Sequence, residues 1–484
     1  MKGKVKYLIV VLVVLQGILL FTYVMFYQSR GYSASISVVH TPVGKKDVVT
    51  NRDQIKQLIQ PKLKSKQAGE KKDVGVQVPN KTIFVDERNG ECNGTKFQYE
   101  HIDDTSWFPV DKGNSMFVFS AYYIKARRKV FIIGAKQKST QRCICQFWYP
   151  YGSKGNMRMT EHPALSKMRS EGKSKLYLAT VFECFLGADQ IPSYISLVTR
   201  SCETPLNMLA VKNVSKPIKY KTRFSVCLSP LYFNYSRAYE LVEWIELNRI
   251  LGAEKFTIYN ISTSINVDKV LEYYSKRGLV EIVQWRLPMR VSKCPGDQSD
   301  IHYFGQTAAL NDCLFRTKRD SEYLVNVDLD EFIIPHGENL FNWTLTIKPY
   351  ENIYNVFMFK STYFRKEWKS IKNDFPEQDQ AEKYKLVSLK VIEREGRIFP
   401  AKRRTKYIAR TASIDVIQIH EVPGSHTAII PPSVALLHHY RNWFNQLDRN
   451  GSVEDNIVRQ LYGTQLINRV RIVWNDLHGV QMEL

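Results

Sequence analysis

The sequence predicts an α/β fold, in which helices cover a parallel sheet, preceded by a β-rich region, a polar stem and a single membrane-spanning helix. Three observations support this prediction. Strand and helix patterns alternate from residue 223, short β-rich pieces fill residues 81–222, and residues 7–27 form an uncharged apolar run. Alternating strands and helices build a parallel sheet covered by helices, because each helix carries the chain back to the same edge.

The apolar run at residues 7–27 has the length of a transmembrane helix. About 20 apolar residues at ~1.5 Å rise each cross the ~30 Å hydrocarbon core of a bilayer. A cleaved signal peptide is the alternative, but its apolar region is about 7–15 residues long and ends at a small-residue cleavage site, which "MFYQSRGYS" does not offer. Lysines precede the run and stay in the cytosol. We therefore expect a type II membrane protein with a cytosolic tail at 1–6, an anchor at 7–27 and a stem at 28–80.

Asparagine sequons and cysteines agree with a secretory lumen beyond the anchor. Sequons matter only in such a compartment, and they begin at Asn80, Asn93, Asn213, Asn234, Asn260, Asn342 and Asn450. The chain has 8 cysteines, an even number, which predicts structural disulfides in an oxidising lumen. Cys143 and Cys145 do not have zinc-like spacing, and no second close pair completes a four-ligand site.

The formal charge of +22 does not indicate a nucleic-acid partner. Lysine and arginine are scattered and partly matched by acids, and no DNA- or RNA-binding motif accompanies them. Behind a membrane, such a balance favours anionic glycans, lipid headgroups or a nucleotide diphosphate.

Two kinds of element pattern divide the remaining chain. Short strands such as "MFVFSAYYI" and "KVFIIGA" alternate with turns between residues 81 and 222, which predicts an antiparallel accessory region without a catalytic signature. From residue 223 the order is strand, helix, strand, helix, strand, helix, strand. These elements read "RFSVCLSPLY", "SRAYELVEWIELNRILG", "KFTIYN", "VDKVLEYYSKRG", "LVEIVQW", "QTAALNDCLFRTKRD" and "EYLVNVDLDEF". In the first helix, Ser236 is suited to cap the start and Gly252 to close the end.

Asp328 and Asp330 follow the last of these strands, at its carboxyl end. Ligands bind outside the carboxyl ends of parallel strands, and residues two apart in extended chain point to one side. Two carboxylates that converge in this way suit Mg²⁺ or Mn²⁺, with water and substrate phosphates completing the ion's ligands. A solvated strand end is the plainer alternative. An EF-hand loop is excluded because glycine and glutamate are missing at its sixth and twelfth positions.

The same D-x-D pattern also ends the first strand of phosphohydrolases of the haloacid dehalogenase type. Those enzymes have Thr or Val two residues after the second Asp, whereas this chain has Phe332. The motif also follows the first strands of the sheet instead of ending the first one. We therefore rank this alternative lower.

Several runs together resemble glycosyltransferase family 92: "VCLSPLYFNYSRAYELVEWIELNRILGAEKFTIYN", "LEYYSKRGLVEIVQW", "GQTAALNDCLFR", "YLVNVDLDEFIIP" and "ALLHHYRNW". The resemblance implies a GT-A fold, a Rossmann-like mixed sheet, at residues 223–470, with a C-terminal tail at 471–484. It also implies an inverting galactosyltransferase of the Golgi or another secretory membrane. Such an enzyme uses UDP-galactose as donor, a glycan as acceptor and Mn²⁺ as cofactor.

The resemblance assigns roles to individual residues. Asp328 and Asp330 match the aspartates that bind the metal and the donor diphosphate. His439 matches the third metal ligand, and His438 ranks next. In a strand these two histidines face opposite ways, so only one is expected to reach the metal.

Other positions are candidates for donor contact. Gln306, Asn311 and Asp312 match a segment suited to ribose or sugar contact, with helix capping and core pairing as the equal alternative. Cys313 is expected to be a disulfide or core partner of Cys227, since no base accompanies it as a nucleophile.

The catalytic base and the basic residues near the site are not fixed by the resemblance. Glu331 is the candidate base closest in sequence to the metal site, although a carboxylate in that position can instead orient other groups. The other candidate bases are Asp297, Asp300, Asp415 and Glu421. Arg403, Arg404 and Lys406 could hold a phosphate or the acceptor, or simply be solvated.

A membrane-anchored protein that binds glycans without turnover is the alternative from another functional class. Asp328, Asp330 and the "HYR" segment argue against it, because a binding protein needs no donor metal.

Overall fold

The computed structural model describes residues 82–83, 92, 97–98, 106–138, 142–151, 156–169, 176–187, 190–215, 217–292, 298–368, 375–442 and 449–484. The predicted tail, anchor and stem lie outside these residues. No helix within the described ranges is long and apolar enough to cross a membrane. Residues 78–484 form one compact unit.

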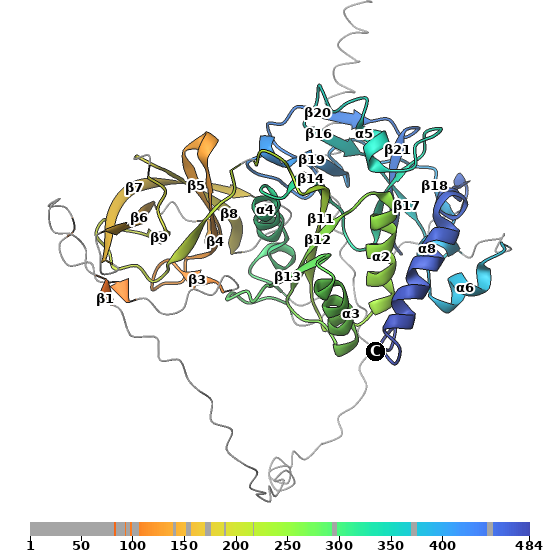
Figure 1. Ribbon diagram of the computed structural model, residues 1–484, viewed down its shortest axis with the longest axis horizontal. Helices are drawn as coiled ribbons and strands as arrows, with labels where there is room; N and C mark the ends of the chain where they lie inside the picture. The colour runs from red at the N-terminus through yellow and green to blue at the C-terminus, as the bar shows by residue number, and fades with distance from the viewer. Residues whose placement is uncertain are drawn as a thin grey trace, which may run out of the picture. The chain divides into compact units, whose positions relative to one another are not determined.

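The β-rich region forms a closed ring of strands (Figure 1). Its strands are β3 (Phe108–Pro109), β4 (Met116–Ile124), β5 (Lys129–Gln137), β6 (Cys143–Tyr151), β7 (Asn156–Arg169), β8 (Tyr177–Phe185), β9 (Tyr194–Val198) and β10 (Leu209–Asn213). The sheet order is β10-β9-β6-β7-β8-β5-β4-β3, and a parallel pairing of β10 with β4 closes the ring. All its other pairings are antiparallel, as the sequence predicted. A short ladder of β1 (Thr82–Ile83) and β2 (Phe97–Gln98) precedes it.

Two disulfides tie this β-rich region together. Cys145 of β6 is bonded to Cys184 of β8, and Cys92 is bonded to Cys202. Cys143 is buried and is not in a disulfide. The structural role expected for the cysteines is confirmed for these pairs.

The second sheet has seven strands in the order β13-β12-β11-β14-β19-β16-β20. Their bounds are β11 (Thr222–Leu231), β12 (Lys255–Asn260), β13 (Val280–Gln284), β14 (Ser321–Asn326), β16 (Val356–Phe359), β19 (Lys406–Arg410) and β20 (Thr427–Ile430). The first four strands in this order are parallel, and β19 runs antiparallel to β14 and β16. The carboxyl ends of β11 and β14 therefore meet at one edge of the sheet.

Helices cover both faces of this sheet. α2 (Ala238–Leu251), α3 (Ile265–Lys276) and α8 (Ile457–Asp476) share a core with alternate residues of β11, including Val226. α4 (Gln306–Thr317) packs on the opposite face, where Cys227 of β11 is bonded to Cys313. The predicted link between Cys227 and Cys313 is thus confirmed as a disulfide. In Figure 1, α2 and α8 run side by side on the sheet.

The ends of α2 and α8 differ in part from the predictions. Gly252 closes α2 with φ 126°, and its N–H donates to the carbonyl oxygen of Asn248. Ser236 does not cap α2, because its hydroxyl donates to the carbonyl oxygen of Leu484 instead. The predicted tail at 471–484 is wrong as a separate segment, since α8 continues to Asp476 and the last residues bond to the start of α2.

A third sheet brings distant segments together in the order β15-β21-β17-β18-β22. Its strands are β15 (Glu331–Pro335), β17 (Ser361–Phe364), β18 (Glu393–Glu395), β21 (Ala435–Tyr440) and β22 (Ser452–Glu454). The antiparallel register of β15 and β21 places Glu331 opposite His439. Short helices complete the chain: η2 (Lys125–Arg127), η3 (His302–Gly305), α5 (Trp343–Ile347), α6 (Gln378–Lys383), α7 (Val387–Lys390) and η4 (Thr411–Ser413).

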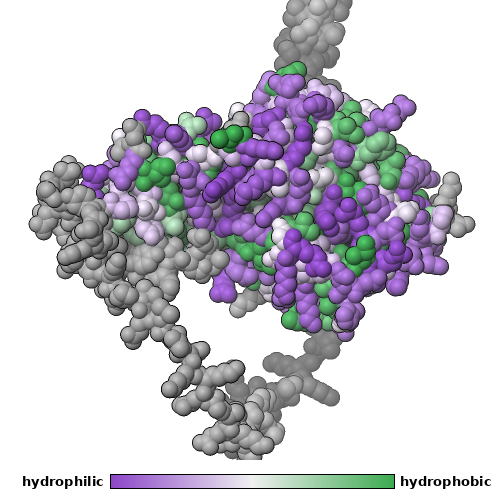
Figure 2. Space-filling view, viewed as in Figure 1, coloured by the Kyte–Doolittle hydropathy of each residue, from purple (hydrophilic) through white to green (hydrophobic). Residues whose placement is uncertain are grey.

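Asp312 of α4 joins the β-rich region to the α/β region. It accepts hydrogen bonds from Ser120 and Tyr122 of β4 and from Tyr259 of β12, and Arg316 pairs with it at 2.6 Å. The two regions therefore share a buried polar contact and one apolar cluster. On the face seen in Figure 2, hydrophilic residues dominate and hydrophobic ones form separate patches.

Candidate active site

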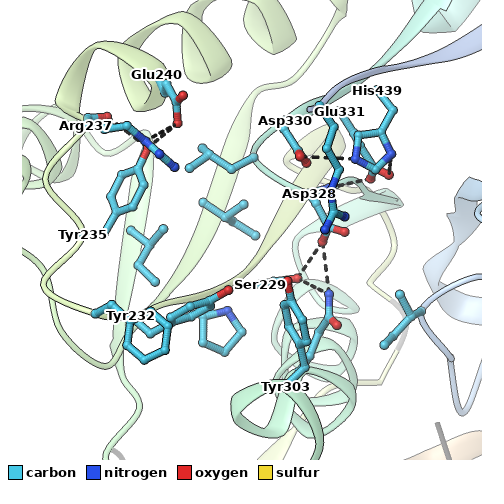
Figure 3. A pocket seen from close by; sticks show the side chains of 18 of the residues that line it. Ser229, Tyr232, Tyr235, Arg237, Glu240, Tyr303, Asp328, Asp330, Glu331 and His439 are labelled. Atoms are coloured by element: carbon cyan, nitrogen blue, oxygen red, sulfur yellow. Dashed lines mark hydrogen bonds and ion pairs between the residues drawn. The ribbon is translucent and has the colours of Figure 1, made fainter. Parts of the chain in front are cut away.

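A cavity of about 810 Å³ opens at the edge of the sheet where β11 and β14 end. The turn between β14 and β15, which carries Asp328 and Asp330, lines one side together with His439 of β21. Figure 3 shows Glu240 and Tyr232 across the cavity from this turn. The predicted D-x-D residues thus lie where parallel sheets place ligands.

Asp330 and His439 form the pair best suited to hold a metal ion. The Nε2 atom of His439 lies 3.2 Å from Oδ2 of Asp330. Ligand bonds of about 2.0–2.2 Å leave adjacent ligands of one ion roughly 3 Å apart, so this spacing fits. A nitrogen and a carboxylate oxygen suit Mn²⁺, with water and phosphate oxygens filling the other positions.

The charges of this pair are coupled. Burial opposes the charge of His439, but the carboxylates of Asp330 and Glu331 outweigh it and raise its pKa. Burial would raise the pKa of Asp330, but His439 beside it lowers that pKa to about 2. The aspartate is therefore ionised, as a metal ligand must be.

Asp328 has both carboxylate oxygens engaged by protein groups. Oδ1 accepts from Ser229 at 2.8 Å and from Gln306 at 3.1 Å, and Oδ2 accepts from Lys406 at 2.7 Å. Although burial opposes ionisation, Lys406 lowers the pKa of Asp328. Of the two aspartates, Asp330 thus presents the more available oxygen to a cation. Asp328 still lines the cavity, where a substrate hydroxyl could replace a partner of Oδ1.

Glu331 lies behind the metal pair. Its Oε2 accepts from the backbone N–H of Asp328 at 3.0 Å and lies 3.3 Å from Nζ of Lys406, while Oε1 lies 3.2 Å from Nδ1 of His439. The side chain is 2% exposed, and burial raises its pKa. This position suits an orienting partner of His439 better than the predicted base, because both oxygens face protein groups.

Of the three residues predicted to contact the donor, Gln306 lines the cavity and the other two do not. Gln306 lines the cavity and donates to Ser229 at 2.6 Å as well as to Asp328. Asn311 instead bonds to the backbone of Thr307 and Ile417, and Asp312 is fully buried at the contact with the β-rich region. The predicted substrate role does not fit Asn311 or Asp312, because their polar atoms are used inside the protein.

The family comparison rests on the α/β region that carries this cavity. The sequence profile of glycosyltransferase family 92 matches residues 222–470, which is just over half of the 484-residue chain. The chain belongs to glycosyltransferase family 92.

Two relatives of this family 92 protein are named as galactosyltransferases. Beta-1,4-galactosyltransferase galt-1 of Caenorhabditis elegans is 32% identical over 126 residues, which are 26% of this chain and 28% of that protein. Galactan beta-1,4-galactosyltransferase of Arabidopsis thaliana is 32% identical over 127 residues, which are 25% of this chain and 23% of that protein. The matches therefore span about a quarter of each relative.

Solved structures show a weaker likeness. The structure of GalNAc-T7 with UDP, GalNAc and Mn²⁺ aligns over 48% of this chain and 46% of that chain, at 10% identity and a TM-score of 0.27. A similarity at this level supports no argument about the family 92 chain.

Most other predicted candidates lie away from the cavity of this family 92 protein. Within the described residues, Asp300, Asp415 and Glu421 do not line it, and they pair with Arg290, Arg127 and Lys402 respectively. Asp297 lies outside the described residues. Arg404 lines the cavity, Arg403 does not, and Lys406 is buried beneath Asp328.

An aromatic wall of the cavity was not predicted. Tyr232 and Tyr303 line the cavity and meet edge to face. Phe304, which does not line it, stacks on Tyr232 with ring centroids 3.9 Å apart. Both loops bend through left-handed backbone, at Phe233 (φ 59°) and at Tyr303 (φ 42°). Glycine usually marks such conformations. The second loop does contain one, Gly305 with φ 71°, whereas the loop at Phe233 has none and gives no such sequence signal.

A basic rim was also missed. Arg237, Lys366 and Arg441 line the cavity with Arg404. Glu240 of α2 pairs with Arg237 at 2.9 Å and lies 3.4 Å from Lys366. These residues are far apart in sequence, so no local pattern groups them. The same lining carries carboxylates, among them Asp330 and Glu240, so the cavity presents charges of both signs.

Proposed function

We propose that this family 92 protein is an inverting glycosyltransferase of GT-A type that transfers galactose from UDP-galactose to a glycan acceptor, with Mn²⁺ as cofactor. We place it in the Golgi or another secretory membrane, as a single-pass type II protein with the catalytic region in the lumen. The observation that carries the proposal is the Asp330 and His439 pair, 3.2 Å apart at the cavity where the parallel strands end. The names of the two relatives support galactose as the sugar.

Different residues of the cavity would bind different parts of the donor. Asp330 and His439 would hold a divalent ion, which would supply positive charge to the leaving diphosphate. Arg404 and Arg441 lie on the same cavity lining and add positive charge for the phosphates. The ring of Tyr232, backed by Phe304, and the ring of Tyr303 present an aromatic surface against which a base or sugar ring can pack.

Glu331 acts in this proposal as a positioning residue. A carboxylate beside Nδ1 of a metal-binding histidine favours the ring orientation that leaves Nε2 free for the ion. Oε1 of Glu331 lies 3.2 Å from that nitrogen, and Lys406 holds Glu331 from the other side. The acceptor hydroxyl therefore needs another base.

Glu240 is the carboxylate that we assign to be tested first as this base. Besides the turn from Asp328 to Glu331, the described cavity lining contains Glu240 and Glu483. Glu483 pairs with Lys385 at 2.7 Å near the chain end, whereas Glu240 lies in the first turn of α2 and faces the cavity. Like Glu331, Glu240 has partners on both oxygens: Oε2 accepts from Arg237 and Tyr235, and Oε1 lies 3.4 Å from Lys366. Its side chain is 14% exposed, against 2% for Glu331, so it is the more accessible of the two to a substrate. A base must reach within about 3 Å of the hydroxyl that it deprotonates.

The proposal is tested by incubating the purified full chain with Mn²⁺, a panel of UDP-sugars and a glycan library. Mass spectrometry of the glycans and measurement of UDP release are the two readouts. We expect a mass gain of one hexose with UDP-galactose. Glycan binding without sugar transfer from any donor would favour the binding protein, and hydrolysis of simple phosphomonoesters would favour a phosphohydrolase.

A further inference from the structure

A second cluster of metal-binding side chains lies on the face of β21 opposite His439. It consists of His336, which follows β15, His438 of β21, and Asp455, which follows β22. None of the three lines the cavity. His438 is fully buried, and the side chains of His336 and Asp455 are 16% and 7% exposed.

Three ligand atoms converge in this cluster. Nε2 of His336 lies 3.2 Å from Nε2 of His438 and 3.0 Å from Oδ2 of Asp455, and Nε2 of His438 lies 3.7 Å from that oxygen. A tetrahedral zinc ion with bonds of about 2.0–2.2 Å keeps its ligand atoms roughly 3.3–3.5 Å apart. The three separations bracket this value.

The hydrogen-bond pattern leaves Nε2 of His336 and Oδ2 of Asp455 as electron-pair donors. Nδ1 of His336 lies 3.0 Å from the carbonyl oxygen of Ile334, which only accepts, so the ring hydrogen belongs on Nδ1. Nε2 of His336 then carries a lone pair directed at His438 and at a carboxylate oxygen. The lone pair of His336 Nε2 and the oxygen of Asp455 lie 3.0 Å apart, and they repel each other unless a proton or a cation lies between them. On His438, Nδ1 lies 3.4 Å from the hydroxyl of Tyr440, and Nε2 faces the same two atoms.

Arg394 orients the carboxylate of the cluster. Its Nε donates to Oδ2 of Asp455 at 2.9 Å. Each carboxylate oxygen has two lone pairs, so Asp455 can accept from Arg394 and still bind an ion. Ligating carboxylates are commonly hydrogen-bonded in this way.

We propose that His336, His438 and Asp455 bind a zinc ion, with the fourth position taken by water. The ion ties together the segments after β15 and β22 and the strand β21. The strands β15 and β21 also carry Glu331 and His439. The zinc ion would therefore stabilise the two strands that hold the donor site. The proposal does not depend on the transferase activity.

The alternative to a zinc ion at this site is a proton held between His336 and Asp455. If His336 carries hydrogens on both nitrogens, it can donate to Ile334 and to Asp455 at once, and no ion is needed. Metal content distinguishes the two cases, because only the zinc site retains an ion on purification.

The test is metal analysis of the full chain, purified without chelator and then equilibrated with limiting zinc. We expect elemental mass spectrometry to find one tightly held zinc ion per chain. His336→Ala and Asp455→Asn should lower this content at least tenfold. His426→Ala, at a histidine outside the cluster that bonds to Ile353, should retain it, and so should Asp330→Asn at the donor site.

Two spectroscopic measurements on the unaltered chain test the proposal even if the variants misfold. X-ray absorption at the zinc edge should show imidazole scattering from two histidines, and cobalt substitution should give the intense visible bands of a tetrahedral ion. A chain that retains no zinc would overturn the proposal. Loss of the zinc in Asp330→Asn with retention in His336→Ala would overturn it as well, by assigning the ion to the cavity.

Discussion

His438 and His439 are neighbours in one strand, yet they occupy opposite chemical surroundings. His439 faces the cavity beside Asp330 and Glu331, whose carboxylates raise its pKa. His438 faces the interior beside His336, and burial lowers its pKa well below the usual range. The alternation of side chains along a strand thus separates two histidines that the sequence presents as a pair.

The two histidines have different partners because their side chains point to opposite faces of the same strand. On the cavity side, three carboxylates of one short turn meet His439 and Lys406. On the interior side, one carboxylate meets two histidines and Arg394. The predictions below separate the tasks of these two clusters.

Asp330→Asn should have the largest effect, because it removes the available oxygen of the donor-site metal pair. Loss of metal assistance worth several kcal/mol predicts a fall in sugar transfer of about 10³-fold or more. Asp476→Asn, at an exposed ion pair with Arg277, is the matched control and should leave transfer unchanged. Transfer that survives Asp330→Asn would remove the metal pair from the mechanism.

Lys406→Met should destabilise the cavity cluster strongly. Nζ of Lys406, with a side chain that is 0% exposed, compensates Asp328 and Glu331. Removing one partner of a buried ion pair costs about 3–5 kcal/mol, which chemical denaturation would measure. Lys402→Met, where the side chain is 71% exposed in its pair with Glu421, should cost less than about 1 kcal/mol. Equal costs would show that Lys406 does not compensate these acids.

The sequence predicted the elements around the cavity well because their signals are local. The strand at 255–260, the helix from Gln306 and the D-x-D turn all follow from periodicity and position. For Asn311 and Asp312 the sequence left donor contact and core pairing equally open. Their polar atoms pair inside the protein, because the face of α4 that carries them packs against other protein groups, which no helical pattern reveals. The cluster of His336, His438 and Asp455 depends on strand register between distant segments, so it could not be read locally.

Glu331→Gln should have a moderate effect that depends on the metal. If Glu331 positions His439, the variant should weaken Mn²⁺ affinity or activity by about 10–100-fold. Saturating Mn²⁺ should then restore most of kcat. A kcat that stays low at saturating Mn²⁺ would instead identify Glu331 as the base, and Glu240→Gln provides the matched comparison.

Lys318 is a second buried lysine, and its effect should appear in how the free energy of unfolding changes with pH. Its Nζ donates to the carbonyl oxygens of Thr411 and Ile414, and burial lowers its pKa to about 8. Between pH 8 and the unfolded-state pKa of about 10.4, the unfolded chain binds a proton that the folded chain lacks. Stability contributed by this group therefore rises with pH in that window.

Lys318→Met should remove this contribution. We expect the slope of unfolding free energy against pH to fall by up to about 1.4 kcal/mol per pH unit above pH 8. Denaturation curves at several pH values measure the slope. Lys348→Met, at an exposed lysine, should leave it unchanged. An unaltered slope in Lys318→Met would contradict the lowered pKa.

The central claim is that Asp330 and His439 hold the donor metal in the cavity. Pulsed electron paramagnetic resonance of Mn²⁺ bound to the full chain with UDP tests it directly, because a ligating imidazole couples its nitrogen to the ion. We expect a nitrogen coupling that disappears in His439→Gln and persists in His302→Gln, a variant at another cavity histidine. A coupling that persists in His439→Gln would contradict the assignment.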